Sequence, residues 1–348
     1  METLRHRLYR RYISLATLID FFFRSLVHWP PKTWAAFWFS KHGLPHRELG
    51  APDIAVRTDT FLNKIIDSHM AFTCIALRQY EQNGFALRAG DTVVDIGGHI
   101  GSFALHAEAQ GARVVSCEPS PKNFRMLCEN MARNNACAVT ALPVCVAVEN
   151  GMRALFLDKS NAARNGLYDC NGAESVSVEA VTLEELFARQ QITHCNFLKM
   201  DCEGAEYEII ETVALDTLAR IEKIAMEYHL PPYFGLDAHK HHITALTEKL
   251  SRAGFAIEIV PENALRGLIF ARNTQAPHTP AGGTSQKKNA AHPSTTARAS
   301  RRRFATRPEL RESHTPADAP KKVSPRRSSS AQSANAKKSR SRRPPKST

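Results

Sequence analysis

Hydrophobic positions near the N-terminus recur every three or four residues, as they do on one face of an α-helix. Pro30 and Pro31 end this predicted helix, and Thr33 to Gly43 predicts a second, aromatic-rich helix. We therefore expect residues 1–60 to form a helical N-terminal extension. The apolar stripe of its first helix consists of Leu8, Tyr12, Leu15, Ile19, Phe22 and Leu26.

From Phe61 onward, a helical segment that reaches Tyr80 is followed by short apolar runs alternating with further helical segments. Such alternation is typical of a parallel sheet covered by helices on both faces. The expected fold class is therefore α/β, with a doubly wound, mostly parallel sheet of seven strands. The predicted strands are Thr92–Ile96, Arg113–Cys117, Leu142–Val148, Asn196–Met200, Lys223–Tyr228, Phe255–Val260 and Leu268–Ala271. The predicted helices are Gly101–Gln110, Pro121–Arg133, Leu183–Gln190, Ala205–Val213 and His239–Ala253.

Two details modify this pattern. Residues 151–181 form an insertion that predicts two extra strands around a polar loop, and Thr182 and Glu185 then predict a capping box on the following helix. Only the short connection 261–267 separates the last two strands. We therefore expect these two strands to pair as an antiparallel hairpin.

Charge separates the C-terminus from the rest of the chain. The formal net charge is +12, but residues 273–348 carry 18 Lys and Arg against 3 Asp and Glu, whereas the other residues carry 28 against 31. This Lys/Arg/Ser/Pro-rich tail has too few apolar side chains to offset the entropy lost on ordering. We expect the tail to be disordered and residues 61–272 to form the folded domain.

The eight cysteines include no CxxC pair, and several lie in apolar runs, which favours a reducing compartment. No apolar run reaches the roughly 20 residues of a membrane span, and Asp20 and Arg24 interrupt the N-terminal apolar stretch. We expect a cytoplasmic protein whose N-terminal helices either pack on the domain or lie on the inner face of an anionic membrane. Trp29, Trp34 and Trp38 would then sit at headgroup depth.

In the stretch "VVDIGGHIG", the first predicted strand of the domain ends in a glycine-rich turn. Gly97, Gly98 and Gly101 allow a ligand to approach the backbone closely. A dinucleotide fingerprint would need a glycine at Ile96, and the carboxylate of Asp95 would repel a pyrophosphate. A negative charge at this turn suits a cationic ligand such as S-adenosylmethionine instead.

A second acidic residue, Glu118, ends the next strand, 23 residues after Asp95. A carboxylate at this place can accept hydrogen bonds from both hydroxyl groups of a ribose. His99 opens the helix after the glycine turn, where it either caps the helix or contacts the same ligand. The two strand ends together predict a site for a nucleoside-containing cofactor.

Four sequence blocks carry a family resemblance: "VVDIGGHIG", "CEPSPKNFRMLCENMARNN", "FLKMDCEGAEYEII" and "KIAMEYH". From Gly90 to Ala271 the chain resembles FkbM-family methyltransferases, a branch of the Rossmann-like class I enzymes that use S-adenosylmethionine. The most specific block, "KMDCEGAE", matches the Lys-x-Asp-x-Glu-Gly-x-Glu pattern of that family. The chain departs from the family at Gly98-His99, where Ala-Asn is common.

The resemblance implies a class I methyltransferase domain over residues 61–272, with S-adenosylmethionine as methyl donor. Members of the family often methylate a hydroxyl oxygen of a sugar or a secondary metabolite, so we expect a small-molecule or glycan acceptor. The residues expected to bind the cofactor are Asp95, Gly97, Gly98, His99, Gly101, Glu118 and Asp201.

Candidate catalytic groups follow the fourth and fifth strands. An alcohol must lose its proton to become a good nucleophile, and a positioned base contributes about 10²–10⁴-fold. Because alternate residues of a strand share a face, Glu227 and His229 lie together. Our hypothesis is that His229 is the general base and that Glu227 or Glu203 orients it. The alternative is that His229 only closes the strand, while Lys199 and Glu206 are expected to have structural roles.

Two other functions remain open. A nucleic-acid methyltransferase would use the basic tail to hold phosphates, although "DCEGAE" lacks the Asn/Asp-Pro-Pro-aromatic turn of enzymes that methylate amino groups of flipped bases. A non-catalytic, methyltransferase-like binding module is the other alternative. The tail is also suited to contact nucleic acid or an anionic membrane without affecting the chemistry. We expect no metal site, because the adjacent histidines His239, His241 and His242 point to different faces of a helix.

Overall fold

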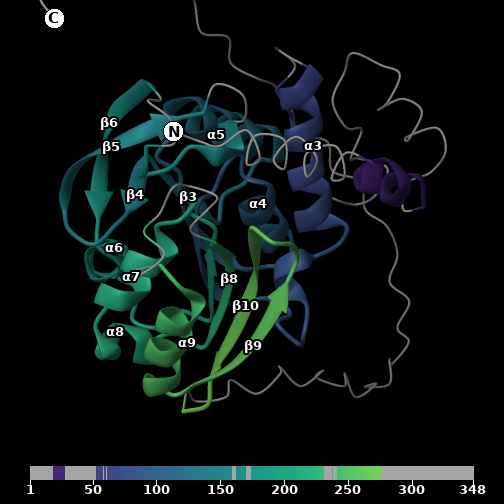
Figure 1. The fold of residues 1–348 in the computed structure, drawn as a ribbon. Helices are drawn as coiled ribbons and strands as arrows, with labels where there is room; N and C mark the ends of the chain where they lie inside the picture. Colours follow the sequence, from purple (N-terminus) through teal and green to yellow (C-terminus); the bar gives the residue numbers. More distant parts are fainter. Residues whose placement is uncertain are drawn as a thin grey trace, which may run out of the picture. The chain divides into compact units, whose positions relative to one another are not determined.

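The alternating apolar segments form a seven-stranded sheet in the computed structural model of the chain (Figure 1). The structure describes residues 19–27, 52–57, 59, 61–158, 162–169, 174–230, 237 and 241–275. The strand order of the sheet is β3-β2-β1-β7-β8-β10-β9. Its strands are β1 (Thr92–Ile96), β2 (Arg113–Cys117), β3 (Val139–Leu142), β7 (Phe197–Met200), β8 (Lys223–His229), β9 (Phe255–Pro261) and β10 (Arg266–Asn273).

The sheet is parallel except for β10, which runs antiparallel to both β8 and β9. This confirms the predicted α/β fold and its C-terminal hairpin. The chain passes outward from β1 through β2 to β3 and later returns to place β7 on the other side of β1. The strand order therefore reverses between β1 and β7, which is where sheets of this kind bind ligands at the carboxyl ends of their strands.

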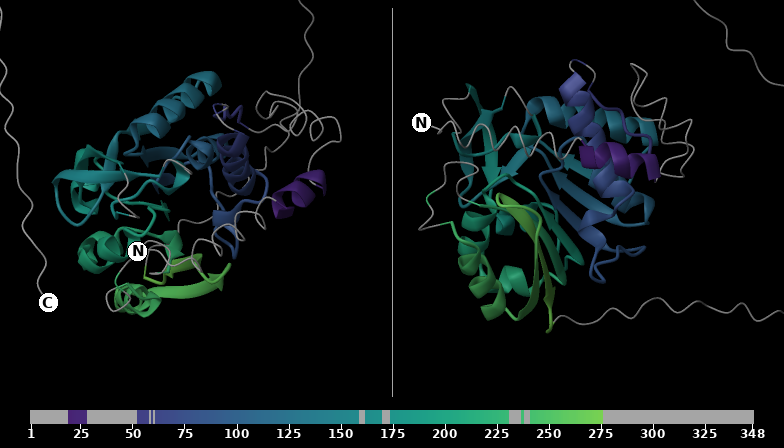
Figure 2. Two further views of the ribbon diagram at one scale, coloured as in Figure 1. Left: turned by 45° about the horizontal axis from the view of Figure 1, so that its top comes forward. Right: turned by 45° about the vertical axis from the view of Figure 1, so that its right-hand side comes forward.

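Helices cover both faces of the sheet (Figure 2). One face carries α6, α7, α8 and α9, and the other carries α3 and α4. The helix α8 was not expected, because a helix of five residues is too short to show a hydrophobic period. The helices are α3 (Phe61–Ile75), α4 (Ser102–Ala109), α5 (Pro121–Asn134), α6 (Leu183–Arg189), α7 (Glu206–Thr212), α8 (Leu215–Ala219) and α9 (Ile243–Arg252), with 3-10 turns η2 (Gln79–Glu81) and η3 (Ala162–Arg164).

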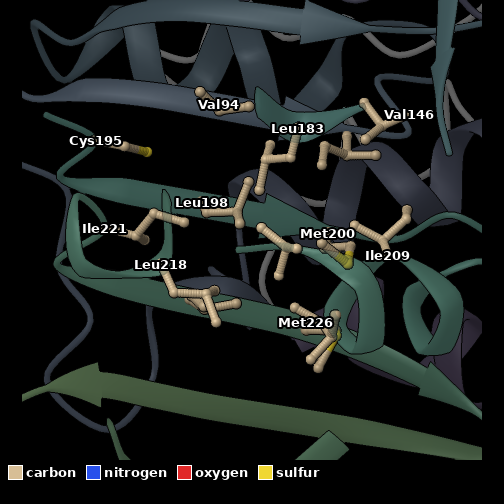
Figure 3. Packing of buried hydrophobic residues seen from close by; sticks show 14 of the residues in the cluster. Val94, Val146, Leu183, Cys195, Leu198, Met200, Ile209, Leu218, Ile221 and Met226 are labelled. Atoms are coloured by element: carbon tan, nitrogen blue, oxygen red, sulfur yellow. The ribbon is translucent and has the colours of Figure 1, made fainter. Parts of the chain in front are cut away.

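The core divides into two large clusters because successive strand residues point to opposite faces. Val93 and Phe197 lie in the cluster under α3 and α4. Val94 and Leu198, their neighbours in sequence, lie in the cluster under α6 to α9 (Figure 3). All four side chains are fully buried. The apolar runs of the sequence are therefore strands that are covered on both sides.

The third predicted strand, Leu142–Val148, is wrong as a single element. It breaks at Pro143 into the end of β3 and a separate strand, β4 (Val144–Val146). Proline has no backbone N–H to donate to a neighbouring strand, which makes it a natural breaking point. β4 joins a three-stranded sheet of order β4-β6-β5. The two strands predicted for the insertion form the rest of that sheet as β5 (Gly151–Leu157) and β6 (Glu174–Val181), paired antiparallel.

The predicted capping box on α6 is half formed. The side chain of Thr182 accepts a hydrogen bond from the backbone N–H of Glu185 at 3.1 Å. The reciprocal position is taken by Asn150, whose side-chain oxygen accepts from the N–H of Thr182, while Glu185 pairs with Arg189.

Replacing Thr182 with Ala should lower the free energy of unfolding by about 1 kcal/mol, because the N–H of Glu185 loses its acceptor at the helix start. Urea denaturation of the two proteins measures the difference. Thr182→Ser keeps the hydroxyl group and serves as the control, which should remain close to the parent protein. Equal losses in both variants would indicate that packing of the threonine methyl group, not the cap, matters here.

In the N-terminal extension the structure describes helical residues 19–27. The side chains of Phe21 and Ser25 are buried, and the ring of Phe21 lies 5.5 Å from that of Phe72 on α3. The predicted stripe faces the other way: Ile19 is 49% exposed and Leu26 is 46% exposed. This helix therefore packs on the domain, but through the face with Phe21 and Ser25 and not through the predicted apolar stripe.

Other parts of the sequence interpretation lie outside the described residues. These are the predicted aromatic helix from Thr33 to Gly43, the three tryptophans and the Lys/Arg-rich tail beyond residue 275. Within the described ranges, no helix combines the length and hydropathy needed to cross a bilayer.

Candidate active site

The glycine turn after β1 is pressed against the end of β7. Gly97 has a φ of +82°, and a Cβ atom at this position would lie 1.8 Å from the carbonyl oxygen of Asp201. Gly98 is equally confined, since a Cβ atom added there would lie 2.2 Å from Oγ of Ser116. The N–H groups of both glycines donate to the carbonyl oxygen of Cys117. The turn thus holds the backbone close to the switch point.

A buried ion pair lies beneath this turn. Nζ of Lys199, on β7, lies 3.0 Å from Oδ1 of Asp95, on β1, and donates to the carbonyl oxygen of Gly97 at 2.6 Å. Burial alone would lower the pKa of Lys199, but the carboxylates of Asp95 and Asp201 outweigh it and raise that pKa. Ser116 donates to the other oxygen of Asp95 at 2.8 Å. Lys199 thus joins β1, β7 and the glycine turn.

Asp95 does not face the ligand space as the sequence interpretation expected. Its side chain is fully buried, and its charge is balanced by Lys199. The acidic side chains that do face this space are those of Glu118, Asp201 and Glu203, and the cavity lining also contains the basic side chains of Lys199, Arg164 and Arg266. Asp95 is therefore not the carboxylate that a ligand in this space would meet.

Glu118, at the end of β2, is fixed by the backbone. Its Oε2 accepts from the N–H of His99 at 2.8 Å, and its Oε1 accepts from the N–H of Ser120 at 2.8 Å. Burial raises the pKa of Glu118 to about 7, and the hydrogen bonds from Ser120 and His99 oppose that rise. A carboxylate has about four lone-pair positions, so these bonds leave Glu118 able to accept from a ligand hydroxyl.

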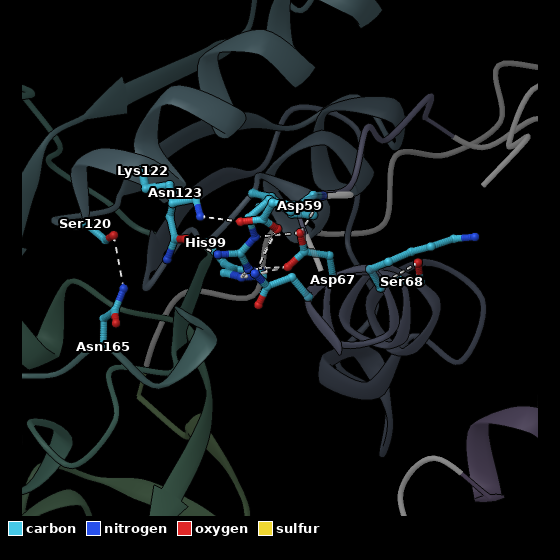
Figure 4. A network of polar contacts seen from close by, with 12 residues as sticks. Asp59, Asp67, Ser68, His99, Ser120, Lys122, Asn123 and Asn165 are labelled. Carbon is cyan, nitrogen blue, oxygen red and sulfur yellow. Dashed lines mark hydrogen bonds and ion pairs between the residues drawn. The ribbon is translucent and has the colours of Figure 1, made fainter. Parts of the chain in front are cut away.

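The imidazole of His99 is held by residues that the sequence analysis did not identify. Nη2 of Arg57 donates to Nε2 of His99 at 3.0 Å, and Nη1 of Arg57 donates to Asn123 at 3.0 Å (Figure 4). Asp67, on α3, makes a buried ion pair with the same guanidinium group. Because Arg57 lies in the N-terminal loop, outside the family resemblance, no local pattern in the sequence pointed to it.

This arrangement fixes the tautomer of His99. Arginine can only donate, so Nε2 of His99 accepts and Nδ1 carries the hydrogen. Burial lowers the pKa of His99 to about 4, which leaves the ring neutral at physiological pH. Nδ1 is buried and has no hydrogen-bond partner in the described part of the chain. It is thus a donor available to a ligand.

A cavity of about 520 Å³ opens at the carboxyl ends of β1 and β7. Its walls come from α3, the glycine turn, the insertion loop before β6, the loop after β7 and the β9–β10 turn. Of the sequence-predicted residues, Gly97, Gly98, His99, Glu118, Asp201 and Glu203 line it. Those that do not line it are Asp95, Gly101, Glu227 and His229.

Beside the cavity, His229 lies among carboxylates. Its Nδ1 is 3.1 Å from Oε1 of Glu206, and its Nε2 is 3.2 Å from Oε1 of Glu227. Burial would lower the pKa of His229, but Glu206 and Glu203 raise it well above its usual value. The ring is therefore protonated at neutral pH, and both N–H groups face carboxylates. Such a ring has no lone pair to accept a proton, which argues against His229 as the general base.

Glu203 is the carboxylate of this cluster that reaches the cavity. It sits 3.7 Å from Nε2 of His229, and its Oε2 is buried without a hydrogen bond within the described ranges. Burial, opposed by His229 and reinforced by Asp201, raises the pKa of Glu203 to about 8. The pKa of Glu227 shifts in the opposite direction. Nη1 of Arg266 lies 2.6 Å from Oε1 of Glu227, overcomes the effect of burial and lowers the pKa of Glu227 to about 2.

Two further side chains of the cavity were missed by the sequence analysis. The hydroxyl group of Tyr80 donates to Oδ2 of Asp201 at 2.9 Å. His69, on α3, lines the cavity with its ring edge-on to Phe21 at 5.5 Å. Burial lowers the pKa of His69 to about 4, so its ring is neutral. Both residues precede the glycine turn, in a helical region without an informative motif.

One group of side chains has the spacing of metal ligands. It consists of Asp201, Glu227 and His229. They offer three ligand atoms within 4.8 Å of one another, which is a closer grouping than the sequence analysis anticipated. The donors already have partners, since Tyr80 binds Asp201 and Arg266 binds Glu227. A metal ion would have to displace these contacts and the proton on His229.

Comparison with known proteins gives a family match for the region around this cavity. Residues 95–257 match the family model described as the methyltransferase FkbM domain. The match includes the glycine turn, Glu118 and the cluster around His229. No curated protein gave a significant match to the chain.

Several solved structures are similar in fold. Precorrin-6y C5,15-methyltransferase from Geobacter metallireducens has 12% identity and a TM-score of 0.35, with 68% of this chain and 100% of that chain covered. Trm5b from Pyrococcus abyssi has 15% identity and a TM-score of 0.33, and the similarity covers 58% of this chain but only 48% of that one. Fibrillarin from Aeropyrum pernix, solved with S-adenosyl-L-methionine, has 14% identity and a TM-score of 0.34, covering 56% and 72%.

Proposed function

We propose that this chain, an S-adenosylmethionine-dependent methyltransferase with an FkbM domain, methylates a hydroxyl oxygen of a small-molecule or glycan acceptor. The observation that carries the proposal is the placement of Glu118, Nδ1 of His99 and Glu203 around one cavity at the switch point. Glu118 and His99 are suited to bind the methyl donor. Glu203 is suited to remove a proton from a hydroxyl group of the acceptor.

The residues around the glycine turn fit the donor. Gly97 and Gly98 lack side chains where the backbone of Asp201 and the hydroxyl group of Ser116 lie, so the turn packs tightly and still lines the cavity. Glu118 would accept from the ribose hydroxyls, and the ring Nδ1–H of His99 would donate to a polar group of the methionine moiety. Asp201 would lie near the positive charge of that moiety. When bound, the donor supplies a methyl group that is electrophilic without help from the protein.

We assign the proton-accepting role to Glu203 in place of His229. Glu203 lines the cavity, whereas His229 does not and is already protonated. The imidazolium of His229, 3.7 Å from Oε2 of Glu203, would instead hold that carboxylate in position. In this assignment Glu227 and Glu206 keep the ring of His229 charged.

Replacing Glu118 with Gln should weaken binding of S-adenosylmethionine by about 10- to 100-fold, because one hydrogen bond to a charged group is worth about 1.5–3 kcal/mol. Isothermal titration calorimetry measures the affinity without any acceptor. Affinity of the parent protein should also decrease below pH 7, since the pKa of Glu118 is about 7 and the protonated form accepts more weakly.

The control for this prediction is Glu211→Gln, which changes an exposed glutamate on α7 away from the cavity. It should bind the donor as the parent does. Equal affinity in Glu118→Gln and the parent would remove Glu118 from the site, and tight binding of NAD instead would contradict the donor assignment as a whole.

The acceptor can be sought in extracts of the native host. Incubation with the protein and isotope-labelled S-adenosylmethionine should produce compounds that gain one labelled methyl group. Fragmentation of these compounds by mass spectrometry identifies the methylated atom. A product methylated on nitrogen or carbon would contradict the O-methylation proposed here.

A further inference from the structure

Exposed apolar side chains gather on one short helix. Within the described residues, seven large apolar side chains are exposed, and four of the seven belong to helical residues 19–27. Ordinary surfaces carry such residues singly. The four are Ile19 at 49%, Phe23 at 60%, Leu26 at 46% and Val27 at 81% exposure.

These four side chains share one side of the helix. Residues four and seven or eight positions apart lie one above another on an α-helix, and Phe23, Leu26 and Val27 stand in this relation to Ile19. The opposite side, with Phe21 and Ser25, is buried against the domain. The helix therefore has two apolar sides, of which the domain uses one.

The sequence before this helix supplies positive charge. In the sequence, apolar residues also precede it at helical spacing, at Leu15, Tyr12 and Leu8. Residues 1–18 also contain four arginines, at positions 5, 7, 10 and 11, against a single acidic residue, Glu2. An apolar stripe accompanied by arginines is the composition of a helix that lies on an anionic lipid surface. A protein partner would require no such charge.

The helix is also part of the cavity wall. Phe21 lines the cavity, and its ring contacts that of His69. The apolar face thus begins on the other side of the element that borders the acceptor space. A surface bound by this face would lie next to the cavity.

We propose that the exposed apolar face of helical residues 19–27 docks the protein on an anionic membrane, and that the acceptor is an amphiphilic hydroxyl compound held in that membrane. The acceptor class rests on the proposed function. The docking does not, because it requires neither donor nor acceptor.

The docking is tested by sedimentation of the full-length protein with vesicles. One set contains phosphatidylcholine alone and the other contains phosphatidylcholine with phosphatidylglycerol. The parent should bind the anionic set. The double variant Phe23→Ser/Val27→Ser should bind at least about tenfold more weakly, because burial of each such side chain is worth roughly this factor or more.

The basic tail could bind anionic vesicles by charge alone, so the measurement is repeated at high salt. Screening removes the contribution of exposed charges, and the difference between the parent and the double variant should persist. The control Met152→Ser/Leu215→Ser exchanges two exposed apolar residues elsewhere, at 65% and 52% exposure, and should bind as the parent does.

Three results would overturn the docking proposal. The parent could remain in the supernatant with both vesicle types. The two double variants could lose binding equally. Light scattering could show a dimer of the parent that Phe23→Ser/Val27→Ser dissociates, which would make a second copy of the chain the occupant of this face. None of these results would affect binding of S-adenosylmethionine, so failure of the docking and failure of the proposed function are distinguishable.

Discussion

Replacing Lys199 with Met should lower the free energy of unfolding by about 3–5 kcal/mol, the cost of leaving one partner of a buried ion pair without the other. The Lys199 side chain is 4% exposed and that of Asp95 is fully buried, so bulk water replaces little of the lost contact. Met fills nearly the same volume, which makes the loss electrostatic. Urea denaturation followed by circular dichroism measures the change.

The double variant Lys199→Met/Asp95→Asn provides the matched control. It removes both charges, and the amide oxygen introduced in place of the Asp95 carboxylate can still accept the hydrogen bond that Ser116 donates. It should therefore recover a large part of the stability lost in Lys199→Met. If Lys199→Met unfolds at the same urea concentration as the parent, the ion pair does not stabilise the end of the sheet.

Replacing Glu203 with Gln should reduce the rate of methyl transfer by about 10²–10⁴-fold, the typical contribution of a general base. Binding of S-adenosylmethionine should change little. Since the pKa of Glu203 is about 8, the parent rate should rise with pH below 8, as the carboxyl group loses its proton, and level off above it. The variant should lose this pH dependence.

The acceptor identified from host extracts serves as the substrate for these rates. Glu248→Gln, at an exposed position of α9 outside the cavity, is the control and should keep both the rate and its pH profile. A Glu203→Gln protein that retains the parent pH profile would transfer the role to another group. His69 would be the first candidate, because its neutral ring lines the same cavity.

The sequence predicted the central sheet well because its strands are buried on both faces and therefore appear as uninterrupted apolar runs. The glycine turn and Glu118 could be placed for a related reason, since their positions follow directly from the ends of β1 and β2. The break at Pro143 was missed because a single proline within an apolar run did not indicate a second sheet.

The charge states of the site could not be predicted, since they depend on residues that only the fold brings together. Glu206 was expected to have a structural role only, yet its Oε1 accepts from the backbone N–H of His229 at 2.8 Å and faces the ring of that residue. This contact across 23 residues helps to keep His229 protonated. Likewise, nothing local showed that Arg57 would fix the tautomer of His99.

The three-stranded sheet β4-β6-β5 has a consequence for how acceptor preference can change. Its insertion loop brings Gly166 against the backbone of Glu203, where a Cβ atom would lie 3.2 Å from the carbonyl oxygen. The strands of this sheet are hydrogen-bonded to one another and do not belong to the seven-stranded sheet. Changes in the loop between β5 and β6 can therefore alter which molecules fit beside Glu203 without interrupting a hydrogen bond of the seven-stranded sheet.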